Sequence, residues 1–196
     1  MDNTLAALKA ELEDYGKQND SAGTARDRRM LNITRDTGEF LSVLVRAAAA
    51  RSILEVGTSN GYSTLWLAES AKAIGGRVTT IELSEYKAGL ASANFHRSGL
   101  AGFIDLVRND AGRVLPLLER DAFNLIFLDS DRSQYCVWWP SLRAILRPGG
   151  LVIADNAISH ADEMRSFIGE VTADSQFTTS VVPVGNGEFL AVKAAA

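Results

Sequence analysis

Two carboxylates and an amide stand where a divalent metal ion would find oxygen ligands. Asp129 follows the apolar run FNLIFL, and Asp155 and Asn156 follow the apolar run GLVIA. Oxygen donors of these kinds suit Mg²⁺, Mn²⁺ or Ca²⁺, and three protein ligands leave positions for water or substrate oxygens. Aspartates at such places also commonly cap helices or pair with a nearby arginine such as Arg132, so this set alone leaves both interpretations open.

A second group of residues has the arrangement of a nucleoside-binding site. The segment EVGTSNGYS (55–63) places Gly57 and Gly61 after an apolar run, where glycines permit a tight turn and a close approach of ligand to backbone. Glu82 ends the next apolar run, where an acid can accept hydrogen bonds from both hydroxyls of a ribose. The alternatives are an ordinary glycine-rich turn and a carboxylate favoured by a helix N-terminus. The spacing Gly-x-x-x-Gly differs from the dinucleotide pattern Gly-x-Gly-x-x-Gly, which disfavours a nicotinamide cofactor.

One further acid follows the third apolar run. Asp110 comes directly after FIDLVRN. There it is suited to accept a hydrogen bond from an exocyclic amine such as that of adenine, or to cap the following helix. The two roles are compatible with each other.

The elements that must position these residues follow from the hydrophobic pattern. Short, nearly continuous apolar runs alternate with segments of helical length, which predicts an α/β protein with a parallel sheet and helices on both faces. The runs are 52–57, 77–82, 103–108, 123–129 and 150–156, and the helical segments between them are 61–74, 84–99, 111–121 and 132–146. Ligands of such sheets bind beyond the carboxyl ends of the strands, where the candidate residues lie.

The N-terminal part is predicted to be helical and then polar. Apolar residues from Leu5 to Tyr15 recur at helical spacing, and a polar stretch over 16–29 separates this helix from another over 36–51. We expect residues 1–35 to form an N-terminal helix and a segment that covers the ligand cleft.

The C-terminal part closes the sheet. A helix over 160–173 is followed by two β-rich runs on either side of Gly185-Asn186-Gly187, which predicts an antiparallel hairpin. We expect residues 1–196 to form a single doubly wound domain.

Composition excludes several classes of protein. The 196 residues contain 20 Lys and Arg against 24 Asp and Glu, and the net charge of −4 argues against broad binding of a nucleic-acid backbone. The single cysteine, Cys136, rules out an intrachain disulfide and favours a reducing compartment. The N-terminal residues lack the apolar core of a signal peptide, and no apolar run approaches the ~20 residues of a membrane span. We expect a cytoplasmic protein without membrane segments.

Together the motifs resemble the class I S-adenosylmethionine-dependent O-methyltransferases, in particular the cation-dependent catechol and caffeoyl-coenzyme A type. The resemblance covers nearly all of residues 30–193. It is carried by ILEVGTSNGYSTLWLA, VTTIELSEYKAGLASANF, FLDSDRSQY and LRPGGLVIADN, in that order. It implies a Rossmann-like seven-stranded sheet, mostly parallel with an antiparallel C-terminal hairpin, and a homodimer.

The resemblance also implies a reaction, with a site for the cofactor and one for the metal. The implied contacts to S-adenosylmethionine come from Ile33, Glu55, Gly57, Ser63, Glu82, Asp110, Ala111 and Asp129. Asp129, Asp155 and Asn156 match the divalent-metal ligands of the family one for one. The implied reaction transfers a methyl group to a hydroxyl of a small ortho-dihydroxylated aromatic acceptor. A phenol titrates near about 10, and a chelated ion, which we expect to be Mg²⁺, would lower that pKa.

One position departs from the family pattern. Arg132 stands where the family usually has a lysine that can act as general base. An arginine, whose pKa lies above about 12, cannot take that role, although its charge can stabilise a phenolate. His160 is the alternative base, or simply a histidine at a helix start. Trp138 and Trp139 either wall the acceptor, lie at a dimer contact or, as is commoner, belong to the core.

Two other functions stay open. Bacterial relatives of this fold methylate a hydroxylated uridine in tRNA, and a basic surface around the cleft would favour that acceptor, whereas the net charge of −4 disfavours it. The other alternative is a protein that binds a nucleoside without turnover, motivated by the arginine at position 132. Arg26, Arg28 and Arg29 are either a solvated surface or a group that gates the cleft or contacts an acidic substrate.

Overall fold

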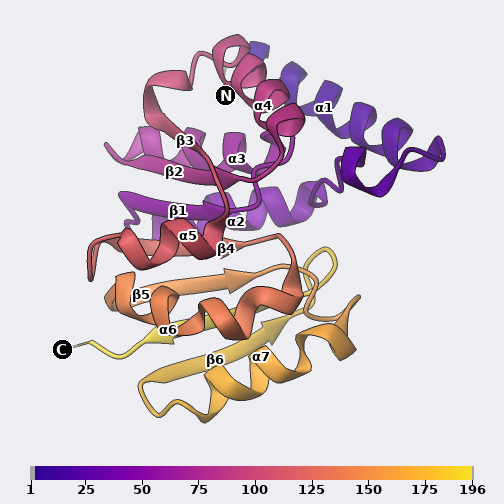
Figure 1. Ribbon diagram of the computed structural model, residues 1–196. Coiled ribbons are helices and arrows are strands. Elements are labelled where there is room, and N and C mark those ends of the chain that lie inside the picture. The colour runs from indigo at the N-terminus through magenta and orange to yellow at the C-terminus, as the bar shows by residue number, and fades with distance from the viewer. Residues whose placement is uncertain (1–2, 196) are drawn as a thin grey trace.

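Seven strands form one mixed sheet at the centre of the computed structural model, which describes residues 3–195 (Figure 1). The strands are β1 (Ser52–Val56), β2 (Arg77–Glu82), β3 (Ile104–Arg108), β4 (Phe123–Leu128), β5 (Leu146–Ala154), β6 (Phe177–Val182) and β7 (Glu188–Lys193). Their order is β3-β2-β1-β4-β5-β7-β6. The first five are parallel, and β7 runs antiparallel to both β5 and β6. The doubly wound sheet and its antiparallel hairpin are therefore confirmed.

Helices cover both faces of this sheet (Figure 1). They are α1 (Asn3–Ser21), α2 (Arg35–Ala47), α3 (Tyr62–Ala73), α4 (Glu85–Arg97), α5 (Ala111–Val114), α6 (Tyr135–Ile145) and α7 (Ala161–Ala173). One cluster of buried side chains joins α1 to α4 with one face, and a second cluster joins α5, α6 and α7 with the other. None of these helices is long and apolar enough to cross a membrane.

The two clusters explain why the strands read as continuous apolar runs. Successive side chains of a strand point to opposite faces of a sheet. In β1, Ile53 belongs to the first cluster, whereas Leu54 and Val56 belong to the second. A strand covered on both faces therefore needs apolar residues at nearly every position.

Two predicted helices are shorter than their sequence patterns indicated. The segment predicted over 111–121 is helical only to Val114, and a 3₁₀ turn follows over Leu115–Leu117. Pro116 lies in that turn, and a proline cannot donate the hydrogen bond that would continue an α-helix. The segment predicted over 132–146 likewise opens with a 3₁₀ turn before α6 begins at Tyr135.

The first helix is longer than predicted. We expected it to end before the polar stretch over 16–29, but α1 continues to Ser21. Gly16 does not end the helix. A Cβ at Gly16 would lie 2.5 Å from the amide nitrogen of Asn32, whose side chain packs there and donates to the carbonyl of Leu12 at 2.9 Å. The glycine thus makes room for a contact between distant segments.

We call residues 22–34, between α1 and α2, the strap. Its Met30 and Leu31 amides donate to the Asp20 carboxylate of α1 at 2.7 and 2.9 Å. On its other side, the hydroxyl of Ser59 donates to the Met30 carbonyl at 2.6 Å. The strap is therefore held between α1 and the loop that follows β1.

Candidate active site

The loop after β1 passes unusually close to the end of β4. Gly57 has φ +107°, and a Cβ there would lie 2.0 Å from the carbonyl oxygen of Asp129. Only glycine tolerates that conformation and that contact. The backbones at Gly57 and Asp129 are consequently neighbours at the carboxyl edge of the sheet.

Glu82, at the end of β2, joins this loop to the next helix. One carboxylate oxygen accepts from the amide of Ser59 and the other from the amide of Ser84, both at 2.8 Å. Ser84 in turn caps α4. Both interpretations made from the sequence therefore fit its position, and each oxygen keeps a further lone pair for a ligand hydroxyl.

Glu55 and Ser63 face each other inside the protein. The fully buried Glu55 carboxylate accepts from Ser63 and Thr80 hydroxyls, each at 2.6 Å, and also from Thr64. Burial raises the pKa of Glu55 to about 7, against these hydrogen bonds, which lower it. These hydrogen bonds link the start of α3 to β1 and β2, so Glu55 stabilises the loop between β1 and α3.

An exposed carboxylate follows the end of β3. Asp110 is at the N-cap position of α5, but its exposed side chain makes no capping hydrogen bond. A Cβ on Gly112 would lie 3.0 Å from this carboxylate and 3.2 Å from the indole nitrogen of Trp138. Asp110 and Trp138 therefore lie close together over Gly112. Two other predicted cofactor contacts, Ala111 and Ile33, have buried side chains.

One apolar residue at this edge was not predicted from the sequence to lie at the site. Leu83 follows Glu82 directly and its side chain is 71% exposed. A large apolar side chain left uncovered beside Glu82 is suited to contact a ligand base. The signal in the sequence is its place between a buried acid and the start of a helix.

The acids after β4 and β5 lie on neighbouring strands. The Asp129 amide donates to Val56, and the Asp155 amide donates to Leu128, so each strand end is tied to the strand beside it. The backbone and side-chain amides of Asn156 donate to the Asp155 carboxylate at 2.7 and 2.9 Å. Asn156 adopts φ +70°, a conformation that asparagine tolerates better than most residues.

Glu188, whose place at the site was not predicted from the sequence, adds a third acid. It begins β7, is fully buried and accepts from the hydroxyl of Thr37 at 2.9 Å. Burial, together with the negative charge of Asp155, raises the pKa of Glu188 to about 9. Its other carboxylate oxygen, Oε2, is buried and has no hydrogen-bond partner among the described residues. An acid directly after a glycine-rich turn and before an apolar strand was the available signal.

The predicted metal ligands have the donor chemistry of a divalent-cation site. Burial and the negative charge of Asp155 raise the pKa of Asp129 well above its usual range. Carboxylates that oppose one another's ionisation are stabilised by a shared cation. Within residues 3–195, no group of three or more His, Cys, Asp or Glu side chains is arranged to hold a metal. The predicted set has two carboxylates and one amide, and its oxygen donors fit a hard ion.

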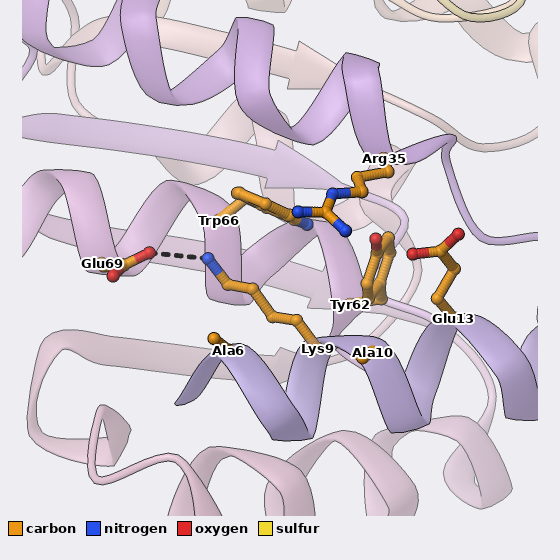
Figure 2. A pocket seen from close by; sticks show the side chains of 8 residues that line it. All are labelled: Ala6, Lys9, Ala10, Glu13, Arg35, Tyr62, Trp66 and Glu69. Carbon is orange, nitrogen blue, oxygen red and sulfur yellow. Dashed lines mark hydrogen bonds and ion pairs between the residues drawn. The ribbon is translucent and has the colours of Figure 1, made fainter. Parts of the chain in front are cut away.

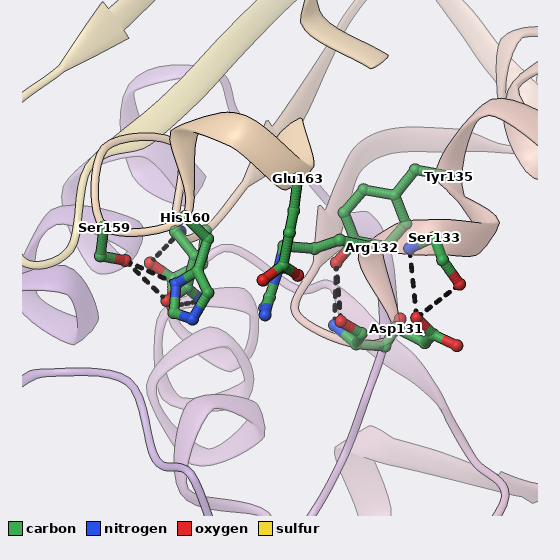
Figure 3. Close-up of polar contacts among 10 residues, drawn as sticks. Asp131, Arg132, Ser133, Tyr135, Ser159, His160 and Glu163 are labelled. Atoms are coloured by element: carbon green, nitrogen blue, oxygen red, sulfur yellow. Dashed lines mark hydrogen bonds and ion pairs between the residues drawn. The ribbon is translucent and has the colours of Figure 1, made fainter. Parts of the chain in front are cut away.

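The positive charge of Arg132 and that of His160 act on Asp155, and both side chains lie beside Glu163 (Figure 3). The Nε of Arg132 donates to Glu163 of α7 at 2.9 Å, and the arginine side chain is only 14% exposed. His160, at the N-cap position of α7, has its Nδ1 2.9 Å from the hydroxyl of Ser159. That hydroxyl also donates to the side chain of Asn156 at 3.1 Å.

The two tryptophans divide between core and edge. Trp139 is buried against Phe167 and Phe177, with ring centroids 5.7 and 4.9 Å away, so it belongs to the core. Trp138 is half-buried and packs beside Tyr135 and over Gly112.

Comparison with known proteins places this arrangement in a family. A family model described as O-methyltransferase matches residues 10–194. Catechol O-methyltransferases of Niastella koreensis and Mycobacterium tuberculosis are 35% and 33% identical over 131 and 138 residues, or 65% and 70% of this chain. These matches span 59% and 62% of the lengths of those proteins. The crystal structure of an O-methyltransferase from Bacillus cereus in complex with SAH is 28% identical, with a TM-score of 0.80 over 98% of this chain and 91% of that one.

Proposed function

Because the chain belongs to the O-methyltransferase family, we propose that it transfers a methyl group from S-adenosylmethionine to a hydroxyl oxygen of a small ortho-dihydroxylated aromatic acceptor. The observation that carries the proposal is the single carboxyl edge shared by Glu82, Asp110 and the pair Asp129–Asp155. A nucleoside-binding half and an oxygen-rich half then lie side by side. The two catechol O-methyltransferase relatives support the class of acceptor.

Binding of the cofactor uses the residues after the first three strands. Glu82 accepts hydrogen bonds from the ribose hydroxyls, and the exposed Asp110 accepts one from the adenine amine. Leu83 and Trp138 contact the base, and the backbone at Gly57 lies against the cofactor. We assign Glu55 and Ser63 the role of positioning the loop between β1 and α3, because the Ser63 hydroxyl donates to the buried Glu55 carboxylate. Ile33 and Ala111 contribute through their backbone, since their side chains are buried.

Asp129, Asp155 and Asn156 would hold a divalent cation, which we propose is Mg²⁺. When bound, such an ion lowers the pKa of an acceptor hydroxyl and orients two adjacent oxygens. Arg132 stabilises the negative charge that develops on the acceptor oxygen. His160 takes up the hydroxyl proton, the S–CH₃ bond breaks as the O–CH₃ bond forms, and S-adenosylhomocysteine leaves.

Labelled S-adenosylmethionine, a panel of catechols, and assays with Mg²⁺ or with excess EDTA test this function. We expect methylated catechol with Mg²⁺ and none with EDTA. Absence of turnover despite cofactor binding would remove catechols as acceptors. Hydroxyuridine in tRNA would then be the next acceptor to assay, before a nucleoside-binding role without turnover.

The variant Asp155→Ala tests the assignment of the metal site. We expect it to abolish metal-dependent turnover, because one of two charged ligands is lost, while the affinity for cofactor stays within about twofold of wild type. Isothermal titration with S-adenosylhomocysteine measures the second quantity. Full activity, or loss of cofactor binding, would contradict the assignment.

We also propose a cytoplasmic homodimer. The single cysteine supports a reducing compartment. Leu117 and Val137, 84% and 72% exposed on the side of the sheet that carries α6, support an apolar contact surface. Light scattering of the purified protein measures its mass, and a monomer would contradict the dimer.

A further inference from the structure

Arg132 interacts with the carboxylate of Glu163 and with those of Asp129 and Asp155. Its Nε donates to Glu163 at 2.9 Å (Figure 3). Arg132 follows Asp129 in the turn after β4, and Asp155 follows the neighbouring strand β5, whose Ala154 pairs with Leu128. The positive charge of Arg132 acts on both aspartates, and in the described part of the chain its guanidinium is hydrogen-bonded to neither of them.

Glu163 is suited to restrain this guanidinium. The hydrogen bond from Arg132 lowers the pKa of Glu163, as do the charges of Arg132, His160 and Arg26, so Glu163 is ionised at neutral pH. It lies in the first turn of α7, where the helix dipole also favours a negative charge. Among residues 3–195, Glu163 is the hydrogen-bond partner of the Arg132 side chain.

The alternative position for the guanidinium is easily identified. An arginine presents a planar fork of donors that pairs with carboxylates in two parallel hydrogen bonds. If Arg132 turned inward, it would form such a pair with Asp129 or Asp155. It would then occupy the carboxylate oxygens that the proposed metal site requires.

We propose that Glu163 is a positioning residue, which holds the Arg132 guanidinium near Asp129 and Asp155 and thereby keeps it from competing with a divalent cation for their oxygens. This inference rests on the proposed function. It predicts that Glu163 matters only while position 132 carries an arginine. A lysine has a single point charge without the fork, so it competes less well for a carboxylate pair.

The test compares Glu163→Gln with Asp162→Asn, both made in the wild-type protein and in Arg132→Lys. Asp162 is the matched control, because it is the adjacent acid and its partner is the exposed Arg165. Binding of Mn²⁺ to the cofactor-free protein is measured by electron paramagnetic resonance. Methyl transfer is measured over a series of Mg²⁺ concentrations, and thermal unfolding confirms that each variant folds.

We expect Glu163→Gln to weaken Mn²⁺ binding by about tenfold, the loss typical of residues that orient a metal site from outside it. The Mg²⁺ concentration for half-maximal turnover rises by the same factor. Asp162→Asn changes neither value. In the Arg132→Lys background, Glu163→Gln changes both by less than about twofold, since no fork is left to restrain.

Two outcomes overturn the inference alone. Either the Mn²⁺ affinity of Glu163→Gln equals that of wild type, or the loss is just as large with lysine at 132, which would make Glu163 a structural residue. A wild-type protein that binds no Mn²⁺ is a different result. It removes the metal from the proposed function, and the inference with it.

Discussion

At the scale of single residues, acids at one edge of the sheet differ in what surrounds them. Asp110 is exposed, Glu82 is bonded to two backbone amides, and Glu55 is wholly enclosed by hydroxyl groups. These surroundings assign different tasks to the same functional group. The exposed or partly bonded carboxylates can accept hydrogen bonds from a ligand. The enclosed Glu55 carboxylate has instead a pKa raised by burial, so its charge changes near neutral pH.

Glu55 should make the folded protein less stable as the pH rises. Its pKa is about 7 in the folded protein against an ordinary 4.5, so folding favours the protonated form. That contribution is fully present below about pH 4.5 and is lost as the pH rises through 7, a change on the order of 3 kcal/mol. Glu55→Gln cannot ionise, so its free energy of unfolding should fall less between pH 5 and pH 8.

Urea unfolding at the two pH values, followed by tryptophan fluorescence, measures this difference. Glu85→Gln is the control, because Glu85 is exposed and its ion-pair partner among residues 3–195 is Arg108 at the surface. An equal loss of stability in wild type and Glu55→Gln would show that Glu55 does not ionise in this range.

At the scale of elements, the Asp20 carboxylate accepts two of the hydrogen bonds that hold the strap to α1. Asp20→Ala removes the acceptor of the Leu31 amide and leaves the Met30 amide with its longer bond, at 3.2 Å, to the side chain of Asn19. If the strap covers the cofactor, loosening it should weaken binding of S-adenosylhomocysteine by about tenfold, since each lost hydrogen bond contributes about 1 kcal/mol. Isothermal titration measures the affinity, and Asp14→Ala on the exposed side of α1 is the control. Unchanged affinity would separate the strap from the cofactor site.

The elements predicted best are those whose limits depend on the hydrophobic pattern of their own residues and not on contacts with distant segments. The span of β2 was predicted to the residue, because its apolar run is flanked by polar positions. The acids after the strands followed from the rule that parallel strands end at one edge. The length of α1 did not, because Gly16 serves a contact with Asn32, which is distant in sequence.

Residues whose roles depend on tertiary contacts could not be predicted. Glu188 meets Asp155 only because β7 pairs with β5 in the register that sets Phe189 opposite Ala154. Glu163 meets Arg132 only because α7 packs beside the turn after β4. No spacing of residues in the sequence predicts either pair.

At the scale of the whole molecule, the N-terminal helix is docked by a buried charge (Figure 2). The Nζ of Lys9 lies 2.6 Å from Glu69 and 3.5 Å above the ring of Trp66, beside a small cavity of about 50 Å³. Burial lowers the pKa of Lys9, although its bond to Glu69 opposes that shift. In this cavity the hydroxyl of Tyr62 and the indole nitrogen of Trp66 have no hydrogen-bond partner among the described residues.

Removing either partner of this ion pair should have unequal effects. Glu69→Ala leaves a buried ammonium group unpaired, and we expect a loss of about 2 kcal/mol, less than for a fully enclosed pair because Glu69 is partly exposed. Lys9→Met replaces the charge with an apolar side chain of similar length and should change the stability by less than about 1 kcal/mol. Urea unfolding measures both. Equal losses of stability in the two variants would show that the unpaired ammonium group is not the cause of the loss in Glu69→Ala.

The strand order has a consequence for the protein during its synthesis. The three strands β3, β2 and β1, and the helices α1 to α4 that cover them, all lie within the first 108 residues. As the nascent chain leaves the ribosome, the glycine loop and Glu82 are therefore available to fold before Asp129 has been translated. Until β4 emerges, β1 is the open edge of a three-stranded sheet, with unpaired backbone groups that another chain can engage. Slow translation between codons 108 and 128 would prolong that exposure, and a chaperone that masks strand edges would act in the same interval.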